Sequence, residues 1–257
     1  MNANKEKIEK LYCLAQDRFH QRDLPHAIDS LKALLVLDFK HLDAHFLLAL
    51  IYAQDQSYEL SNQHFRTCIE EGYKTSELYK LIALNSKQLA LYKNALHELQ
   101  KHLHYNPEDD DAYALMGDVY VLQKEYPYAK KVYQQAIKMD PKKPLYYYKI
   151  AHIYEAENDL KQAILEAQKA LVLDANYHEV IFYIATLYAK MEAFEKAIEH
   201  YEKAISINKN IALYHHNLAI SLENIQEKSK ALEAHNHALT LEPQNSHYQK
   251  SLNIIQT

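Results

Sequence analysis

The sequence predicts an all-α protein, a right-handed α-α superhelix of stacked helical hairpins that ends in a capping helix. The first observation is a period of 34 residues that runs seven times from Ile8 without an insertion. The second is helical spacing of apolar residues within each period, and the third is the presence of only two glycines, which leaves few turns for a sheet. A fixed period of this length is typical of solenoids.

Small residues recur at two positions of the period. The eighth position reads Ala15, Ala49, Ala83, Gly117, Ala151, Ala185 and Ala219, and the twentieth reads Ala27, Ser61, Ala95, Ala129, Ala163, Ala197 and Ala231. Small side chains there let the two helices of a hairpin approach closely. The twenty-eighth position is apolar in every repeat, from Leu35 to Leu239, and we expect it to fill the layers between hairpins.

The fourth repeat shows why each unit contains two helices. Its first half has one apolar face, formed by Tyr113, Met116, Gly117 and Tyr120. Its second half has another, formed by Ala129, Val132, Tyr133, Ala136 and Ile137. Both sets follow helical spacing. Pro141 ends the second helix, because proline lacks an amide donor and clashes with the preceding turn.

These positions divide the chain into a polar lead-in (1–7), seven repeats and a final helix (246–257). The predicted repeats are 8–41, 42–75, 76–109, 110–143, 144–177, 178–211 and 212–245. In the final helix we expect Tyr248, Leu252 and Ile255 to face inward and polar residues to face out, which is how a solenoid is capped. The array is therefore expected to be finished at this end, while Met1 is either a true start or the start of a fragment.

The repeat positions resemble those of the tetratricopeptide repeat family. The family has a large residue at position four, Leu-Gly/Ala at seven and eight, Tyr at eleven, Ala at twenty and twenty-seven, and Pro at thirty-two. The fourth and sixth repeats match best; the sixth has Ile181, Ile184, Ala185, Tyr188, Ala197, Tyr201 and Ala204. The first three depart most, as Arg18 and Ser86 at position eleven illustrate. The resemblance covers residues 8–245 and implies the fold far more strongly than a function.

Other features predict a cytoplasmic protein. The longest apolar run, Phe46 to Ala53, is much shorter than the roughly 18 residues of a membrane span, and Met1 to Lys7 is too polar for a signal peptide. Cys13 and Cys68 are expected to be reduced core residues rather than a disulfide.

Charge argues against nucleic acid as a partner. The net charge is −5, and the arginines Arg18, Arg22 and Arg66 all lie in the first two repeats, so no basic stripe is available for phosphates. The acidic run Glu108 to Asp111 follows Pro107. We interpret it as a helix cap, where carboxylates meet free amides and the positive end of the helix dipole.

Sixteen histidines raise the question of a metal site. His97 and His102 lie five residues apart, one too many for the zinc-protease spacing, and His41 and His45 have i, i+4 spacing but are expected to be exposed imidazoles without a metal. Packing positions are occupied by His102, His215 and His235. Phosphate loops and nucleophile motifs are absent from the sequence. We therefore predict no metal, no cofactor and no enzymatic activity.

The resemblance implies that the first helices line a concave groove with positions two, five, nine, twelve and thirteen. The candidate groove residues are Tyr12, Gln16, Phe19, Phe46, Leu50, Lys80, Leu84, Asp118, Val121, Tyr148, His152, Phe182, Thr186 and His216. Many are large and apolar, which predicts that another molecule or the next turn of the protein covers them. An amphipathic helix or extended peptide is the favoured occupant.

Two ligand motifs of the family are missing from these positions. Of the clamp that captures acidic chaperone tails, Lys80 alone is present, and the asparagine ladder at position six is absent. The predicted function is a protein-interaction scaffold that acts as an adaptor, assembly factor or chaperone. The alternatives are a substrate-recognition domain of a larger enzyme and a self-associating structural array.

Overall fold

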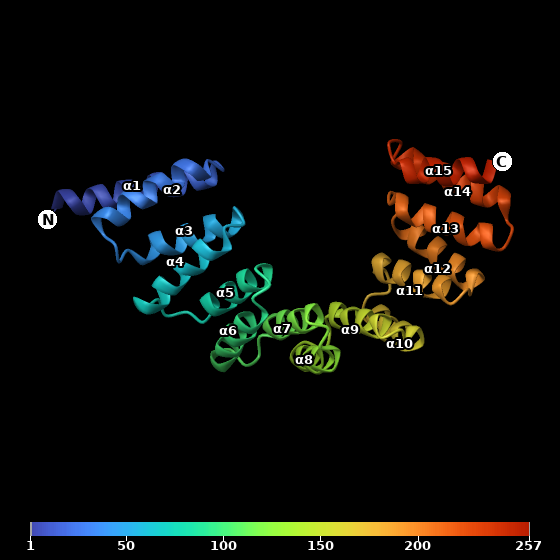
Figure 1. Ribbon diagram of the computed structural model, residues 1–257, viewed down its shortest axis with the longest axis horizontal. Helices are drawn as coiled ribbons and strands as arrows, with labels where there is room; N and C mark the ends of the chain where they lie inside the picture. The colour runs from blue at the N-terminus through green and yellow to red at the C-terminus, as the bar shows by residue number, and fades with distance from the viewer. Residues whose placement is uncertain (1, 257) are drawn as a thin grey trace. The chain divides into compact units, whose positions relative to one another are not determined.

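The computed structural model describes residues 2–256, with side chains from residue 4 to residue 252. The helices are α1 (Asn2–His20), α2 (Leu24–Leu37), α3 (Leu42–Gln54), α4 (Tyr58–Glu70), α5 (Glu77–Gln88), α6 (Tyr92–Tyr105), α7 (Asp110–Leu122), α8 (Tyr126–Met139), α9 (Pro144–Ala156), α10 (Leu160–Leu173), α11 (His178–Lys190), α12 (Phe194–Ile207), α13 (Ala212–Asn224), α14 (Lys228–Leu241) and α15 (Ser246–Gln256). The described residues contain no strand, which confirms the predicted all-α class (Figure 1).

The helices form two compact units, Met1–Val132 and Tyr133–Thr257, and the division falls within α8. In the first unit, the hairpins α1/α2, α3/α4 and α5/α6 follow one another and lead to α7 (Figure 1). The second unit contains the hairpins α9/α10, α11/α12 and α13/α14, followed by α15. Helix α1 begins at Asn2, so the predicted lead-in is helical from that residue on.

Close packing within the hairpins follows from the small residues. Every residue at positions eight and twenty of the repeats, from Ala15 and Ala27 to Ala219 and Ala231, is buried. The apolar residues at position twenty-eight are half-buried in all seven repeats. Both sets have the expected packing roles: the small side chains let the two helices of a hairpin touch, and the larger side chains pack between one hairpin and the next.

The core of each unit is a chain of local clusters. Ala15 of α1, Leu31 of α2 and Leu48 of α3 belong to one cluster, so the first helix of the second hairpin completes the core of the first. The same arrangement recurs in the second unit, where Ala185 of α11 and Tyr201 of α12 share a cluster with Ala219 of α13. Stability therefore depends on contacts between sequence neighbours, as in other repeat proteins.

The turn inside each hairpin has a left-handed residue at position fifteen. Arg22, Gln56, Ala90, Lys124, Asn158, Glu192 and Gln226 have φ values between 56° and 64°. In the third hairpin the amide of Ala90 donates to the carbonyl of Lys87 at 3.0 Å, and the amide of Leu91 donates to that of Ser86 at 2.8 Å. This pattern closes the first helix with a Schellman motif and reverses the chain.

One expectation concerning the cysteines is wrong. Cys13 is exposed rather than a core residue, whereas Cys68 is buried as expected. Both are free thiols. In α15, Tyr248 is buried and Leu252 is half-buried, whereas Ile255 lies outside the described side chains. Among the described residues, none of the helices combines the length and apolarity that a membrane span requires.

Candidate peptide-binding surface

The candidate groove residues of the first unit all lie on the first helices of their hairpins or on α7. They are Tyr12, Gln16 and Phe19 on α1, Phe46 and Leu50 on α3, Lys80 and Leu84 on α5, and Asp118 and Val121 on α7. Gln16 and Leu84 are exposed, and the others are half-buried. Leu84 exposes 40% of its surface although its neighbours Ile82 and Ala83 are core residues. These side chains have both a packed base and a face that a partner can cover.

In the second unit, three of the candidate residues, Tyr148, His152 and Phe182, belong to a set of contacting aromatic rings. The ring of Tyr148 on α9 lies 5.2 Å from that of Tyr183 on α11. The adjacent Phe182 stacks on Tyr214 of α13, with a centroid distance of 4.4 Å and an interplanar angle of 20°. These two ring pairs, which we call the aromatic row, belong to three successive first helices. His152 joins it, with its ring 4.5 Å from Tyr148.

A hollow lies next to this row. Its volume is about 400 Å³, and it is lined by Thr186, Ala189 and Lys190 of α11, Phe194 and Tyr201 of α12, and Asn217, Ile220 and Ser221 of α13. Thr186 is the candidate groove residue in this lining. The lining mixes two aromatic rings with hydroxyl, amide and ammonium groups, a combination that can bury an apolar side chain while bonding a peptide backbone.

His216 departs from the prediction, because it is only 3% exposed. Its ring lies 4.6 Å from that of Tyr248 on α15. Since α15 continues the repeat phase, it covers position five of the last repeat. Burial, with the neighbouring His235 and His247, lowers the pKa of His216 to about 4, so this imidazole is neutral near pH 7. His216 is a core residue under the cap.

Polar groups border the aromatic row beside Tyr148. Glu155 forms an ion pair with Lys190, and its Oε2 lies 3.4 Å from Nδ1 of His152. Burial lowers the pKa of His152, and Glu155 offsets only part of this effect. Burial and Glu155 raise the pKa of Tyr183, whose buried hydroxyl has no partner at hydrogen-bonding geometry. Phenols with raised pKa values stay protonated, so this patch offers ring faces and hydrogen bonds rather than an activated nucleophile.

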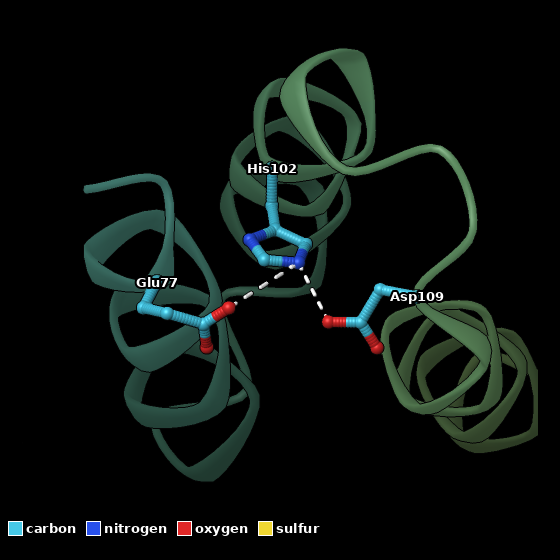
Figure 2. A group of neighbouring side chains, drawn as sticks. All are labelled: Glu77, His102 and Asp109. Atoms are coloured by element: carbon cyan, nitrogen blue, oxygen red, sulfur yellow. Dashed lines mark hydrogen bonds and ion pairs between the residues drawn. The ribbon is translucent and has the colours of Figure 1, made fainter.

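Lys80 belongs to an ionic cluster that joins three helices. Figure 2 shows the ring of His102, from α6, between the carboxylates of Glu77 and Asp109. Nε2 of His102 lies 2.8 Å from Oδ2 of Asp109 and 3.9 Å from Oε1 of Glu77, while Nδ1 donates to the carbonyl of Ser76 at 3.0 Å. The ammonium of Lys80 contacts the same two carboxylates, at 2.7 Å for Asp109 and 3.0 Å for Glu77.

The same cluster has to be considered as a metal site. Ligand atoms of Glu77, His102 and Asp109 lie within 4.8 Å of one another. However, the Lys80 ammonium already compensates both carboxylates, and the two ring nitrogens of His102 already contact the Ser76 carbonyl and the Asp109 carboxylate. A metal ion would have to displace Lys80 and one of these ring contacts. We therefore interpret the cluster as an ionic link between α5, α6 and α7, and independence from metal stays a prediction.

Asp109 also confirms the capping role predicted for the acidic run. Its Oδ1 accepts the amide proton of Ala112 at 2.9 Å at the start of α7. Burial alone would raise the pKa of this carboxyl group, but hydrogen bonds from Lys80, Ala112 and His102 outweigh burial and lower it to about 2. Asp110 and Asp111 follow in the first turn of α7, where the helix dipole favours negative charge.

His41 and His45 are not the exposed pair expected from their spacing. His45 is buried; its Nε2 donates to the carbonyl of Phe39 at 2.8 Å, and its Nδ1 lies 2.7 Å from Nδ1 of His64. His41 caps α3 by accepting the amide proton of Ala44. Position four is a packing position, and a histidine can be buried there because a loop carbonyl accepts a hydrogen bond from its ring. His215 does the same in the last repeat, donating to the carbonyl of Lys209 at 2.9 Å.

His215 and His235 confirm the prediction of core histidines, since both are buried. His235 Nε2 lies 2.5 Å from the Glu223 carboxylate. The burial of His102 was likewise expected from its packing position.

Two kinds of residue on this surface were missed from the sequence. The first is the acidic set at position two, where Glu9, Asp43, Glu77, Asp111 and Glu179 are all exposed. Position two was expected to line the groove, so the repeated carboxylates could have been identified by comparing the residues at that position across the repeats. The second is the set of tyrosines from outside the groove positions, such as Tyr73 and Tyr214, which reach Phe46 and Phe182.

Comparison with known proteins agrees with the repeat assignment. Family models described as tetratricopeptide repeat match residues 12–69, 145–177 and 178–211, and one described as TPR repeat matches residues 117–157. A search of curated proteins found no significant match.

Several solved structures share the fold. One is the C-terminal part of a TPR repeat-containing protein from Cytophaga hutchinsonii, with a TM-score of 0.73 and 19% identity over 94% of this chain and 99% of that one. A tetratricopeptide repeat protein from Parabacteroides merdae has a TM-score of 0.69 and 16% identity over 98% and 100% of the two chains. YrrB, described as a TPR protein with an unusual peptide-binding site, has a TM-score of 0.55 and 21% identity over 73% and 96%. At these identities the likeness concerns the fold alone.

Proposed function

The chain belongs to the tetratricopeptide repeat family, and on that premise we propose that it is a non-enzymatic protein-interaction module. It binds a peptide or an amphipathic helix of another protein along its first helices, without a cofactor or metal. Modules of this kind act as adaptors, assembly factors or chaperones.

The aromatic row across α9, α11 and α13 carries this proposal. Single exposed apolar residues also occur on the second helices, for example Leu165, and such isolated residues are normal on any surface. The first helices of the second unit differ because Tyr148 and Phe182 are half-buried rings that pack on the buried rings of Tyr183 and Tyr214. A hollow of about 400 Å³ is also lined by residues of α11, α12 and α13. Half-buried rings beside a hollow are what a docking partner requires.

The energetics favour aromatic anchors. Complete coverage of a large apolar side chain is worth roughly 1.5–3 kcal/mol. Two or three anchors such as Tyr148 and Phe182 therefore supply several kcal/mol before the cost of immobilising the peptide is subtracted. An isolated leucine on a second helix can supply only one such contribution.

A random peptide library displayed on phage and selected on the purified protein tests the proposal. For a selected peptide, Phe182→Ala and Tyr148→Ala should each weaken binding about tenfold, the equivalent of 1.4 kcal/mol. Leu165→Ala, on the second helix α10, is the matched control and should leave affinity unchanged. Circular dichroism checks that all three variants keep their helices.

The proposal fails if the peptides bind all three variants with the affinity of the unchanged protein. It also fails if Leu165→Ala is as harmful as Phe182→Ala. The self-association alternative gives a separate result, a mass that rises with protein concentration in light scattering.

A further inference from the structure

A set of four residues occurs twice on the first helices, once in each unit. Tyr12, His41, Asp43 and Phe46 occupy positions five, thirty-four, two and five around the junction of the first two repeats. Tyr148, Tyr177, Glu179 and Phe182 occupy the same positions four repeats later. Each set therefore combines a tyrosine, a second ring, a carboxylate and a phenylalanine, and only the tyrosine and the phenylalanine of each set were predicted groove residues.

A further tyrosine completes each set. We call Tyr12, His41, Asp43, Phe46 and Tyr73 the first aromatic box, and Tyr148, Tyr177, Glu179, Phe182 and Tyr214 the second aromatic box. The ring of Tyr73 stacks on Phe46 with centroids 5.6 Å apart and an angle of 8°. In the second box, Tyr214 stacks on Phe182 at 4.4 Å.

The completing tyrosines come from different places in the repeat. Tyr73 lies in the segment between α4 and α5, whereas Tyr214 is part of α13. The stack on the phenylalanine is therefore not a simple consequence of the repeat period. A loop tyrosine in one box and a helical tyrosine in the other stack on phenylalanines at the same repeat position.

The remaining rings lie close to these stacks. Tyr12 and His41 have centroids 5.4 Å apart, and Tyr148 and Tyr177 have centroids 5.9 Å apart with their planes at 62°. Tyr214 is only 3% exposed, but Tyr148, Tyr177 and Phe182 are half-buried. The second box thus has a buried ring at its base and half-buried rings at its rim, whereas all the rings of the first box are half-buried.

The carboxylate of each box is exposed, and its charge acts on the phenols of the box. Burial raises the pKa of the Tyr12 hydroxyl, and the charge of Asp43 raises it further. Burial likewise raises the pKa values of Tyr148, Tyr177 and Tyr214, and the charge of Glu179 adds to the increase at each of these phenols. The geometry agrees for Tyr214, because Nδ1 of His178 lies 3.3 Å from Oε2 of Glu179 and 2.9 Å from the hydroxyl of Tyr214, so the carboxylate and this phenol share a neighbour.

The charge of Glu179 is available to a ligand. Its side chain is 54% exposed, and its recorded ion-pair partner is Nδ1 of His178 at 3.3 Å. Asn208 contacts Nε2 of that ring, and Nδ1 lies 2.9 Å from the hydroxyl of Tyr214. Among the described residues, no lysine or arginine forms an ion pair with Glu179, so its carboxylate can pair with a cation of a ligand.

We propose that each aromatic box binds a cationic side chain, arginine or lysine, of the partner segment; this inference rests on the proposed function. The faces of aromatic rings are electron-rich, and a carboxylate at the rim adds a full negative charge. An apolar side chain would pack against the ring faces but leave the carboxylate without a partner. An anionic side chain would be repelled.

The chain itself places a cation at an equivalent position. Lys80 occupies position five of the third repeat, where the boxes have Tyr12 and Tyr148. Its ammonium is bound 2.7 Å from Asp109, which stands at the position of His41 and Tyr177. The space beside position five therefore accepts a cation when negative charge is present.

Two matched probes test the proposal. One is a capped hexapeptide with a central arginine between leucines, and the other carries citrulline, the neutral isostere, at the same place. Binding is followed by NMR shifts of backbone amides during titration. The arginine probe should bind roughly fivefold more tightly than the citrulline probe, given the usual strength of cation–π contacts. The largest shifts should fall near Glu179 and Asp43.

Protein variants assign the effect to the boxes. Glu179→Gln should reduce the affinity of the second box for the arginine probe to that for the citrulline probe. Glu195→Gln is the matched control, because Glu195 also stands exposed in the first turn of its helix, α12, but outside the box. Asp43→Asn with Glu59→Gln as its control repeats the comparison for the first box.

Equal affinities of the two probes overturn the proposal, as does an equal effect of Glu179→Gln and Glu195→Gln. The outcome is separable from that of the proposed function. Library peptides that bind the aromatic row without any basic residue would support the interaction module and refute the cation-binding boxes. An arginine probe that binds the boxes when no library peptide uses the row would do the opposite.

Discussion

The residue at position fifteen of each repeat has a backbone conformation that its side chain does not favour. All seven of these residues have a positive φ, and none of them is a glycine. A left-handed conformation costs an ordinary L-residue roughly 1–2 kcal/mol. The cost is tolerated because the Schellman hydrogen bonds close the first helix and set the direction of the second.

Ala90→Gly should therefore stabilise the protein. Glycine removes the steric cost, although the greater freedom of the unfolded chain cancels part of the gain, so we expect roughly 0.5–1 kcal/mol. Thermal unfolding followed by circular dichroism measures the change. Ala33→Gly, at an exposed site inside α2, is the control and should lower stability by about 1 kcal/mol. A decrease in melting temperature for Ala90→Gly would show that the turn is not strained.

At the scale of helices, the ionic link around Asp109 connects α5, α6 and α7, three helices that also share an apolar cluster. Lys80 lies on α5, His102 on α6, and Asp109 caps α7. The folded-state pKa of Asp109, about 2, lies below the ordinary value for an aspartate. A lowered pKa means that the ionised group stabilises the fold at neutral pH, and that this contribution is lost as the pH falls from about 4 toward 2.

Asp109→Asn isolates this contribution, because asparagine still caps a helix but carries no charge. The variant should be less stable than the unchanged protein by roughly 1–3 kcal/mol at pH 7, and the difference should shrink between pH 4 and pH 2. Asp159→Asn is the control, since Asp159 caps α10 by accepting the amide proton of Gln162. A stability difference for Asp109→Asn that stays constant with pH would contradict the link.

The helices and their inner faces could be predicted because their signals are local and repeated. The positions of Ala15 and Ala27 within the period were enough to place them at the hairpin interface, and Pro107 marked Asp109 as a cap. The contact between Lys80 and Asp109 could not be found in this way, because it joins side chains 29 residues apart and the other repeats have different residue types at these two positions. The stack of Tyr214 on Phe182 depends on side-chain rotamers, which the sequence pattern does not specify.

The groove residues show the same limit. His216 fits the position-five pattern, but α15 covers it, and the pattern of one repeat does not tell which neighbour lies above it. The acidic residues at position two were detectable in principle. They have a second role in helix starts, where negative charge is favourable anyway, so their position alone does not identify a binding site.

At the scale of the whole molecule, stability should vary along the chain. Within each unit the hairpins contact their sequence neighbours, so local stabilities are not averaged over the array. The first three repeats depart most from the family positions, and they bury polar groups such as Asn85 and Glu98. We expect residues 8–107 to exchange amide hydrogens faster than residues 110–210, as measured by mass spectrometry. Uniform protection across all seven repeats would contradict this expectation.

Recognition by the first helices is the central claim, and photo-crosslinking locates the ligand most directly. A library-selected peptide is synthesised with p-benzoylphenylalanine in place of one aromatic residue, irradiated on the protein, and the crosslinked segments are identified by mass spectrometry. We predict crosslinks within α9, α11 and α13, next to Tyr148, Phe182 and Ile220, and their loss when unlabelled peptide competes. Competable crosslinks confined to α10, α12 and α14 would mean that the second helices bind the partner, and would contradict the claim.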